Sequence, residues 1–168
     1  YRSIYILPYA IPAFISIIVF KGLLNPDYGV VNEWFAPLYE LFNIEPINWF
    51  RTKGSSRAAV LLVNTWLGFP YMFLIATGAL QSIPKELLEA AKVDGASPSQ
   101  SFWRITFPLL LVSISPLLIG AFAFNFNNFT LIFLLTSGGP PIVGADVAVG
   151  YTDILISFTY DLAIAGGR

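Results

Sequence analysis

The sequence predicts an all-α fold, a polytopic bundle of transmembrane helices, from three observations. Of the 168 residues, 56% are hydrophobic and only 11% are charged, which leaves too little polar surface to cover a water-soluble globule of this size. Three apolar stretches are long enough to cross the hydrocarbon core of a bilayer, which takes roughly 20 helical residues. A polar segment between the second and third stretches carries helix start and stop signals.

The composition also excludes several classes of function. Nine basic residues stand against ten acidic ones with no block of like charge, so nucleic acid is not an expected partner. The chain has no Cys and no His, which removes disulfides, thiol nucleophiles, histidine-dependent triads and the usual zinc ligands. We therefore expect no catalytic residue, no metal site and no cofactor.

The three apolar stretches are interrupted by helix-breaking residues. Proline and glycine at membrane depth break backbone hydrogen bonds, so such helices usually face other helices or a watery cavity. Ordinary kinks in packed helices are the alternative explanation. The stretches cover about residues 4–24, 58–80 and 105–135; the first contains Pro8 and Pro12, the second Gly68 and Pro70, and the third Pro108, Pro116 and Gly120.

The connection after the first stretch, about residues 25–57, is long and aromatic. Residues 25–29, Asn-Pro-Asp-Tyr-Gly, are a turn signal. Pro37 could open a short helix. This connection is too interrupted to span a membrane, and its aromatic content indicates a segment in the headgroup zone. The residues concerned are Leu38, Leu41 and Phe42 on one side of the helix, together with Trp34, Phe35, Trp49 and Phe50.

The charges in the connections between the apolar stretches indicate only weakly how the chain is oriented in the membrane. Residues 25–57 hold three basic and four acidic residues, whereas residues 82–104 hold three of each. The positive-inside rule thus slightly favours a cytoplasmic location for residues 82–104. Residues 136–153 are rich in Gly and Pro and are expected to form an extracytoplasmic loop. Since a new apolar stretch opens at Ile154, we expect this chain to be a fragment of a longer protein.

The second connection is predicted to form two short helices around a corner. Ser82 can cap a helix over residues 85–94, most of which are good helix formers. Gly95 suits the left-handed position that ends it. Ser97, with Gln100 three residues later, is a capping-box start for a second helix that continues into the third apolar stretch.

This helix and its glycine corner have the form of a docking element. Small residues leave room for the close approach of another protein, and nearby charged residues could pair with it. An amphipathic connector that merely lies on the membrane is the alternative. The small residues are Ala90, Ala91 and Gly95, and the charged ones are Glu89, Lys92 and Asp94.

The spacing of these residues resembles a known signature. Glu89-Ala90-Ala91, three residues, Gly95, nine residues, Ile105, one residue and then Phe107-Pro108 is similar to the EAA motif of bacterial ABC import permeases. Phe107 stands where the motif has Leu, and the position stays apolar. The resemblance implies a cytoplasmic coupling helix that docks into a separate ATPase, with Glu89, Ala90, Ala91, Asp94 and Gly95 as the coupling residues.

The same resemblance implies on which side of the membrane each connection lies, and that a separate protein binds ATP. If residues 82–104 are cytoplasmic, the first and third connections face the periplasm or the cell exterior. The Gly138-Gly139-Pro140-Pro141 run lacks the Lys-Ser/Thr of a Walker loop, so ATP would be bound by another protein.

Asparagines at membrane depth indicate a candidate ligand pathway. Asn is costly in hydrocarbon unless it is paired. On a helix, Phe124, Asn125 and Asn128 would share one side, and residues 64, 67, 68 and 71 have a similar spacing. Amides can hydrogen-bond sugar hydroxyls, and aromatic rings can cover the C–H faces of pyranoses. Interhelical Asn bridges of roughly 0.6 to 2 kcal/mol each, without any ligand, are the alternative.

A second resemblance favours a sugar as the transported ligand. Residues 7–12, 63–72 and 122–129 look like the matching stretches of the larger permease subunit in importers of the maltose/maltodextrin type. Ala13 and Ala121 stand where two serine contacts are expected, which leaves the identity of the sugar open but not its class. The implied sugar contacts are Tyr9, Asn64, Leu67, Gly68, Tyr71, Phe124, Asn125 and Asn128.

Together these features predict that residues 1–168 are part of an ABC permease domain in the bacterial inner (plasma) membrane. The implied partners are a second permease subunit, two copies of an ATPase, a periplasmic or extracellular sugar-binding protein, an oligosaccharide and membrane lipid.

Three alternatives remain open. Another neutral sugar or a glycerol phosphate could be the cargo, although a phosphate calls for Arg or Lys at membrane depth and the three stretches contain only Lys21, near an end. An ion-coupled transporter or channel would be expected to carry acidic residues within the spans, and the three stretches have none. A membrane enzyme would have only Asp153 and Asp161 available as bases.

Overall fold

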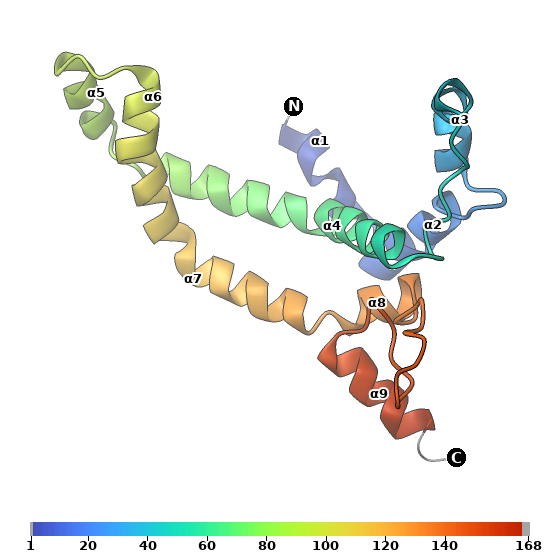
Figure 1. The fold of residues 1–168 in the computed structure, drawn as a ribbon. Helices are drawn as coiled ribbons and strands as arrows, with labels where there is room; N and C mark the ends of the chain where they lie inside the picture. The colour runs from blue at the N-terminus through green and yellow to red at the C-terminus, as the bar shows by residue number, and fades with distance from the viewer. Residues whose placement is uncertain (1, 166–168) are drawn as a thin grey trace. The chain divides into compact units, whose positions relative to one another are not determined.

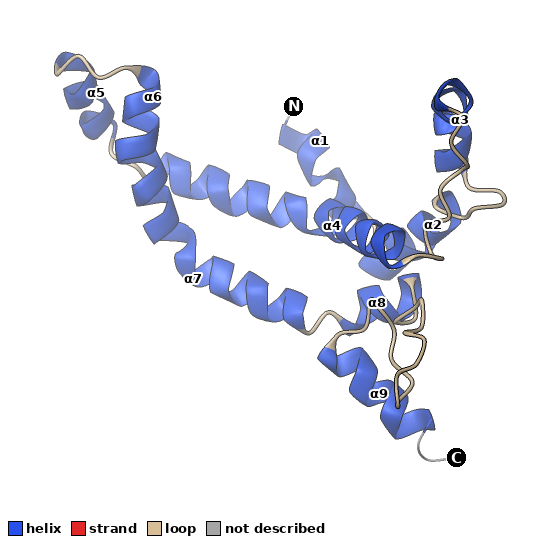
Figure 2. Cartoon of the chain, viewed as in Figure 1, coloured by secondary structure: helices blue, strands red, loops and turns tan. Residues whose placement is uncertain are grey.

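The computed structural model describes residues 2–165, with side chains from Ile4 to Ile164. Within this range the regular structure is helical and contains no strand (Figure 2), so the prediction of an all-α fold is confirmed. The elements are α1 (Arg2–Ile6), η1 (Leu7–Ala10), α2 (Ala13–Leu23), α3 (Val30–Phe42), α4 (Lys53–Gln81), α5 (Lys85–Val93), α6 (Pro98–Ser101), η2 (Phe102–Thr106), α7 (Phe107–Phe126), α8 (Phe129–Leu135) and α9 (Leu155–Ala165).

The helices form two compact units. The first contains the described residues up to Gly68 and those from Phe126 onward, whereas the second is Phe69–Asn125. Helix α4 is continuous from one into the other (Figure 1).

Two helical stretches are long and apolar enough to cross a membrane. They are Lys53–Gln81, with 29 residues, and Pro98–Leu135, with 38. At 1.5 Å per residue the shorter one reaches roughly 43 Å, more than a hydrocarbon core of about 30 Å. They contain the apolar stretches recognised in the sequence over 58–80 and 105–135.

The apolar stretch over residues 4–24 is not one straight helix. Ile4–Ala10 and Ala13–Leu23 meet at a bend of 101°. Pro12 has no N–H to continue a helix and forces the residue before it into an extended conformation; Ile11 accordingly has φ −106° and ψ 129°. The two pieces together have the length and apolarity of a broken span or a re-entrant loop.

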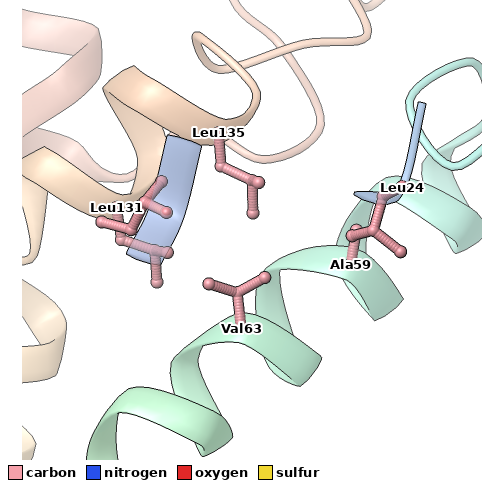
Figure 3. Packing of buried hydrophobic residues seen from close by; sticks show 6 residues of the cluster. Leu24, Ala59, Val63, Leu131 and Leu135 are labelled. Atoms are coloured by element: carbon pink, nitrogen blue, oxygen red, sulfur yellow. The ribbon is translucent and has the colours of Figure 1, made fainter. Parts of the chain in front are cut away.

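A small apolar core holds the first unit together. Ile17 and Leu24 from the region of α2 meet side chains of α4 and α8, and each core residue is at most 2% exposed. Figure 3 shows Val63 of α4 facing the leucines of α8, and Ala59 of α4 beside Leu24. Because Ala59 is small, the backbones can approach closely, as is common between membrane helices. The α8 members are Leu131 and Leu135.

Outside this core the long helices display apolar side chains to their surroundings. On α7 of the second unit, Val112 is 74% exposed and Ile119 is 70% exposed. Such residues are usually buried in water-soluble proteins. Lipid or neighbouring membrane helices are their expected surroundings.

Helix α3 is longer than the sequence predicted. It begins at Val30, and Pro37 lies inside it rather than at its start. An internal proline removes one backbone hydrogen bond and can be tolerated at a kink. The helix ends at Asn43, which is left-handed with φ 50° and ψ 47°, and the Ile44 amide donates to the Tyr39 carbonyl over 2.9 Å.

The aromatic residues expected in the headgroup zone divide into two groups. Trp49 and Phe50 are half-buried and pack against the core of the first unit. Trp34 and Phe35 on α3 are exposed at 75% and 44%. Trp49 and Phe50 thus help to pack the segment after α3 against the core, and the location of these aromatic residues in the headgroup zone stays a prediction.

A polar network closes the loop between α8 and α9. The Asp153 carboxylate accepts from the Gly150 amide (2.7 Å) and from the Ser157 hydroxyl (2.8 Å). Gly138 is left-handed, with φ +77°, and a Cβ there would overlap the Asp153 carboxylate. The Thr152 amide donates to the Gly138 carbonyl (3.0 Å). The loop thus has a specific fold despite its Gly and Pro content.

Candidate coupling element and pathway residues

The coupling element lies in the second unit, where α5 follows α4 after a short turn. Ser82 does not cap α5 as predicted, because its hydroxyl instead donates to the Ala79 carbonyl at the end of α4 (2.8 Å). Pro84 occupies the N-cap position with φ −58° and ψ 128°. The fixed φ of proline starts the helix without a side-chain cap.

The glycine corner is formed as predicted. Gly95 has φ +77°, and two backbone hydrogen bonds close the end of α5: Ala96 N–H to Ala91 C=O (2.9 Å) and Gly95 N–H to Lys92 C=O (3.2 Å). This pair of bonds is a Schellman motif, which favours glycine at the left-handed position. A Cβ at Gly95 would meet nothing within 4 Å, so the restriction comes from the backbone and not from crowding.

The predicted capping box starts the following helix. The Gln100 amide donates to the Ser97 hydroxyl (3.3 Å), and the Ser97 amide donates to the Gln100 side-chain oxygen (2.8 Å). Both bonds satisfy amides that a helix start leaves unpaired.

A π-helical segment that the sequence analysis missed follows α6. In η2 the Phe107 amide donates to the Phe102 carbonyl, five residues earlier. Pro108 explains the change, since a proline has no N–H for the carbonyl four residues before it, here Arg104, and its ring crowds that carbonyl. A wider turn relieves this conflict, and Pro108 was the available signal in the sequence.

The surface of the coupling element is mostly open. Glu89, Ala90, Asp94 and Gly95 are exposed, whereas Ala91 is only 8% exposed. Ala91 therefore faces the body of its own unit, and the other four predicted residues remain accessible to a partner.

The predicted sugar contacts of the first unit differ in their surroundings. Tyr9 on η1 is 51% exposed. On α4, Asn64 is half-buried, Leu67 packs against the apolar core, and Gly68 is exposed. Leu67 thus helps to hold α4 in the unit. Asn128 is half-buried, and its side-chain oxygen accepts from the Leu131 amide (3.3 Å), which caps α8.

In the second unit the predicted contacts lie on α4 and at the end of α7. Tyr71 is half-buried and Phe124 is 70% exposed. The side-chain amide nitrogen of Asn125 donates to the Ala121 carbonyl (2.7 Å) in its own helix. The expectation that Phe124, Asn125 and Asn128 share one helix face is wrong, because α7 ends at Phe126 and Asn128 starts a new helix.

Metal binding has no support in the described part of the chain. No cluster of three or more carboxylate, His or Cys side chains is present among the residues searched there.

Known proteins similar to this chain are membrane transport components. It is 52% identical over 167 residues to the maltose/maltodextrin transport system permease protein MalF of Salmonella typhimurium, covering 99% of this chain and 32% of that protein. The identity is 51% to MalF of Yersinia pestis (99% and 31% covered) and 50% to that of Escherichia coli (99% and 32%). This chain therefore spans about a third of the length of these relatives.

The fold is also similar to solved structures. A bacterial ABC transporter involved in the import of the acidic polysaccharide alginate matches with a TM-score of 0.73 at 23% identity, covering 99% of this chain and 55% of that one. At this identity the likeness concerns the fold alone. The family model described as "binding-protein-dependent transport system inner membrane component" matches residues 1–167, and the chain belongs to this family.

Proposed function

We propose that this chain is part of the membrane-spanning permease subunit of an ATP-driven importer for oligosaccharides of the maltodextrin type. Membership of the inner-membrane transport family and identities of 50% to 52% to maltose/maltodextrin permeases support this proposal. The permease forms the translocation pathway and performs no covalent chemistry itself.

The observation that carries the proposal is the exposed helix α5 with its left-handed corner at Gly95. It joins α4 to α6, at the ends of the two long apolar stretches, and it carries the EAA spacing. Glu89 and Asp94 offer two exposed carboxylates to a cytoplasmic ATPase, and the exposed Ala90 between them has a small side chain. Ala91 anchors the helix to its unit, so a force on α5 is transmitted to the membrane helices.

Alternating access is the mechanism that fits this arrangement. A soluble binding protein delivers the sugar to a cavity that is open to the outside, and closure of two ATPase copies moves α5 on the inner side. A second permease subunit completes the pathway. The continuous run from the capping box at Ser97 through η2 into α7 gives a direct connection between the docked corner and a membrane helix.

We propose that the sugar-contact residues interact with the sugar in different ways. Tyr9 and Phe124 present aromatic rings for the C–H faces of the sugar, while Asn64 and Asn125 have amide groups suited to its hydroxyls. Leu67 packs against the core and would shape the cavity wall. Gly68, Tyr71 and Asn128 complete the set that we propose by resemblance to the maltose permeases.

A neutral cargo fits better than a phosphate. Lys21, the one cation within the three apolar stretches recognised in the sequence, donates to the Leu134 carbonyl (3.0 Å) at the end of α8. This hydrogen bond directs the ammonium group to the protein backbone. A phosphate site would be expected to use Arg or Lys as a direct partner.

The test is reconstitution of the full-length subunit with its partner permease, ATPase and binding protein in lipid vesicles. We expect maltodextrins to stimulate ATP hydrolysis and to be taken up in an ATP-dependent manner, with glycerol 3-phosphate and alginate oligosaccharides as comparison cargoes. Uptake of a charged cargo without maltodextrin uptake would refute the sugar assignment. Failure of the subunit to bind any ATPase would refute the assignment as an importer.

A further inference from the structure

One side of α3 is an exposed apolar surface. Trp34, Leu38 and Leu41 follow one another at steps of four and three residues, so they form a stripe along the helix. Their exposed fractions are 75%, 47% and 74%. Phe35 and Phe42 border the stripe and are 44% and 65% exposed. These five residues are the α3 apolar face.

The opposite side of α3 is fixed to the first unit, which prevents the apolar face from turning inward. Asn32 is only 8% exposed; its side-chain amide donates to the Ile47 carbonyl (2.9 Å), and its oxygen accepts from the Tyr39 hydroxyl (3.3 Å). Val31 lies one turn before Phe35 on the side of the apolar face and packs against the core of the first unit, so it is not part of the exposed face. The direction of the apolar face is therefore set by specific contacts.

The connection to α2 keeps α3 close to the end of a membrane helix. The Gly29 amide donates to the Asn25 carbonyl (2.9 Å), and the Asn25 side chain accepts from the Asp27 amide (2.9 Å). A Cβ at Gly29 would overlap the carbonyls of Leu23 and Asn25, so the turn is tight.

We propose that α3 lies in the headgroup region of the bilayer, with the α3 apolar face turned toward the acyl chains. Trp is typical of this zone, and apolar faces of interfacial helices enter it to a depth of about 5–10 Å. Exposed Glu33 and Glu40 occupy a separate side of the helix, and α3 has no Lys or Arg. Attachment therefore depends on aromatic and apolar insertion into zwitterionic lipid and not on attraction to anionic lipid.

This inference depends on the membrane crossing of the helices that flank α3 and is independent of the transported sugar. Its test compares neighbouring positions on the two sides of the helix. Leu41→Cys and Trp34→Cys probe the apolar face, while Glu40→Cys and Glu33→Cys are the matched controls. All four side chains are exposed, so no substitution removes a core contact.

Each variant of the full-length subunit, freed of any other cysteine and assembled with its partners, is spin-labelled in phosphatidylcholine nanodiscs. Collisions with oxygen, which concentrates in lipid, are compared with collisions with a water-soluble nickel complex. We expect the oxygen-to-nickel ratio to be several-fold higher at positions 34 and 41 than at 33 and 40, and to be insensitive to salt.

Two results would overturn the proposal. Equal, high nickel accessibility at all four positions would place the apolar face in water. Low accessibility to both reagents at positions 34 and 41 would show that another protein surface covers it.

Discussion

Replacement of Gly95 by Ala isolates the contribution of the left-handed corner to coupling. Because a Cβ at Gly95 would meet nothing within 4 Å, the penalty comes from φ +77° alone. For an ordinary L-residue this is roughly 1–2 kcal/mol, which lowers the population of the folded corner by a factor of about 5–30. Asn tolerates left-handed backbone better, so Gly95→Asn should retain more of the corner than Gly95→Ala.

The assay is ATP-dependent sugar uptake by the reconstituted importer, expressed per ATP hydrolysed. We expect this ratio to fall strongly for Gly95→Ala and less for Gly95→Asn, while membrane insertion is unchanged. Gly144→Ala is the matched control, since Gly144 also has positive φ (+84°) and open surroundings but lies in the loop between α8 and α9. Normal coupling in Gly95→Ala, or an equal loss in Gly144→Ala, would refute the reasoning.

Three further predictions concern capping, loop folding and sugar contact. Ser97→Ala removes the capping box and should destabilise the start of α6 by about 1 kcal/mol, seen as faster hydrogen exchange of its first amides. Gly138→Ala places a Cβ against the Asp153 carboxylate at φ +77°, so thermal unfolding of the purified subunit should begin at a lower temperature. Phe124→Ala should raise the sugar concentration for half-maximal uptake by roughly 2- to 10-fold through loss of ring contact, whereas Phe122→Ala, at the same 70% exposure, should not.

The features that the sequence predicts correctly are those decided by neighbouring residues. The Schellman end at Gly95 needs only a left-handed residue after α5, and the capping box needs only Ser97 and Gln100 at their spacing. The apolar stretches likewise follow from composition over about 20 residues. Short-range signals of this kind do not depend on the rest of the fold.

The features that the sequence did not predict are those in which contacts between distant segments, or competing local hydrogen bonds, determine the position of a residue. That Trp49 and Phe50 pack against the core formed by α2, α4 and α8 was not predicted, because this contact joins segments far apart in the sequence. The spacing of Asn128 predicts that it continues a helix face, but its side chain caps α8 instead. Such a local bond competes with continuation of the helix. Helices of partner subunits would complete the proposed sugar cavity, so the eight proposed contact residues remain a prediction.

The most direct test of the central claim is the side of the membrane on which α5 lies. Lys92→Cys on exposed α5 and Val143→Cys, at a position that is 95% exposed in the loop before α9, are placed singly in the full-length subunit and treated with a membrane-impermeant maleimide. The account predicts that Lys92→Cys reacts only in inverted vesicles and that bound ATPase slows this reaction. It predicts that Val143→Cys reacts only from the outer face. Reaction of Lys92→Cys from the outer face would contradict it.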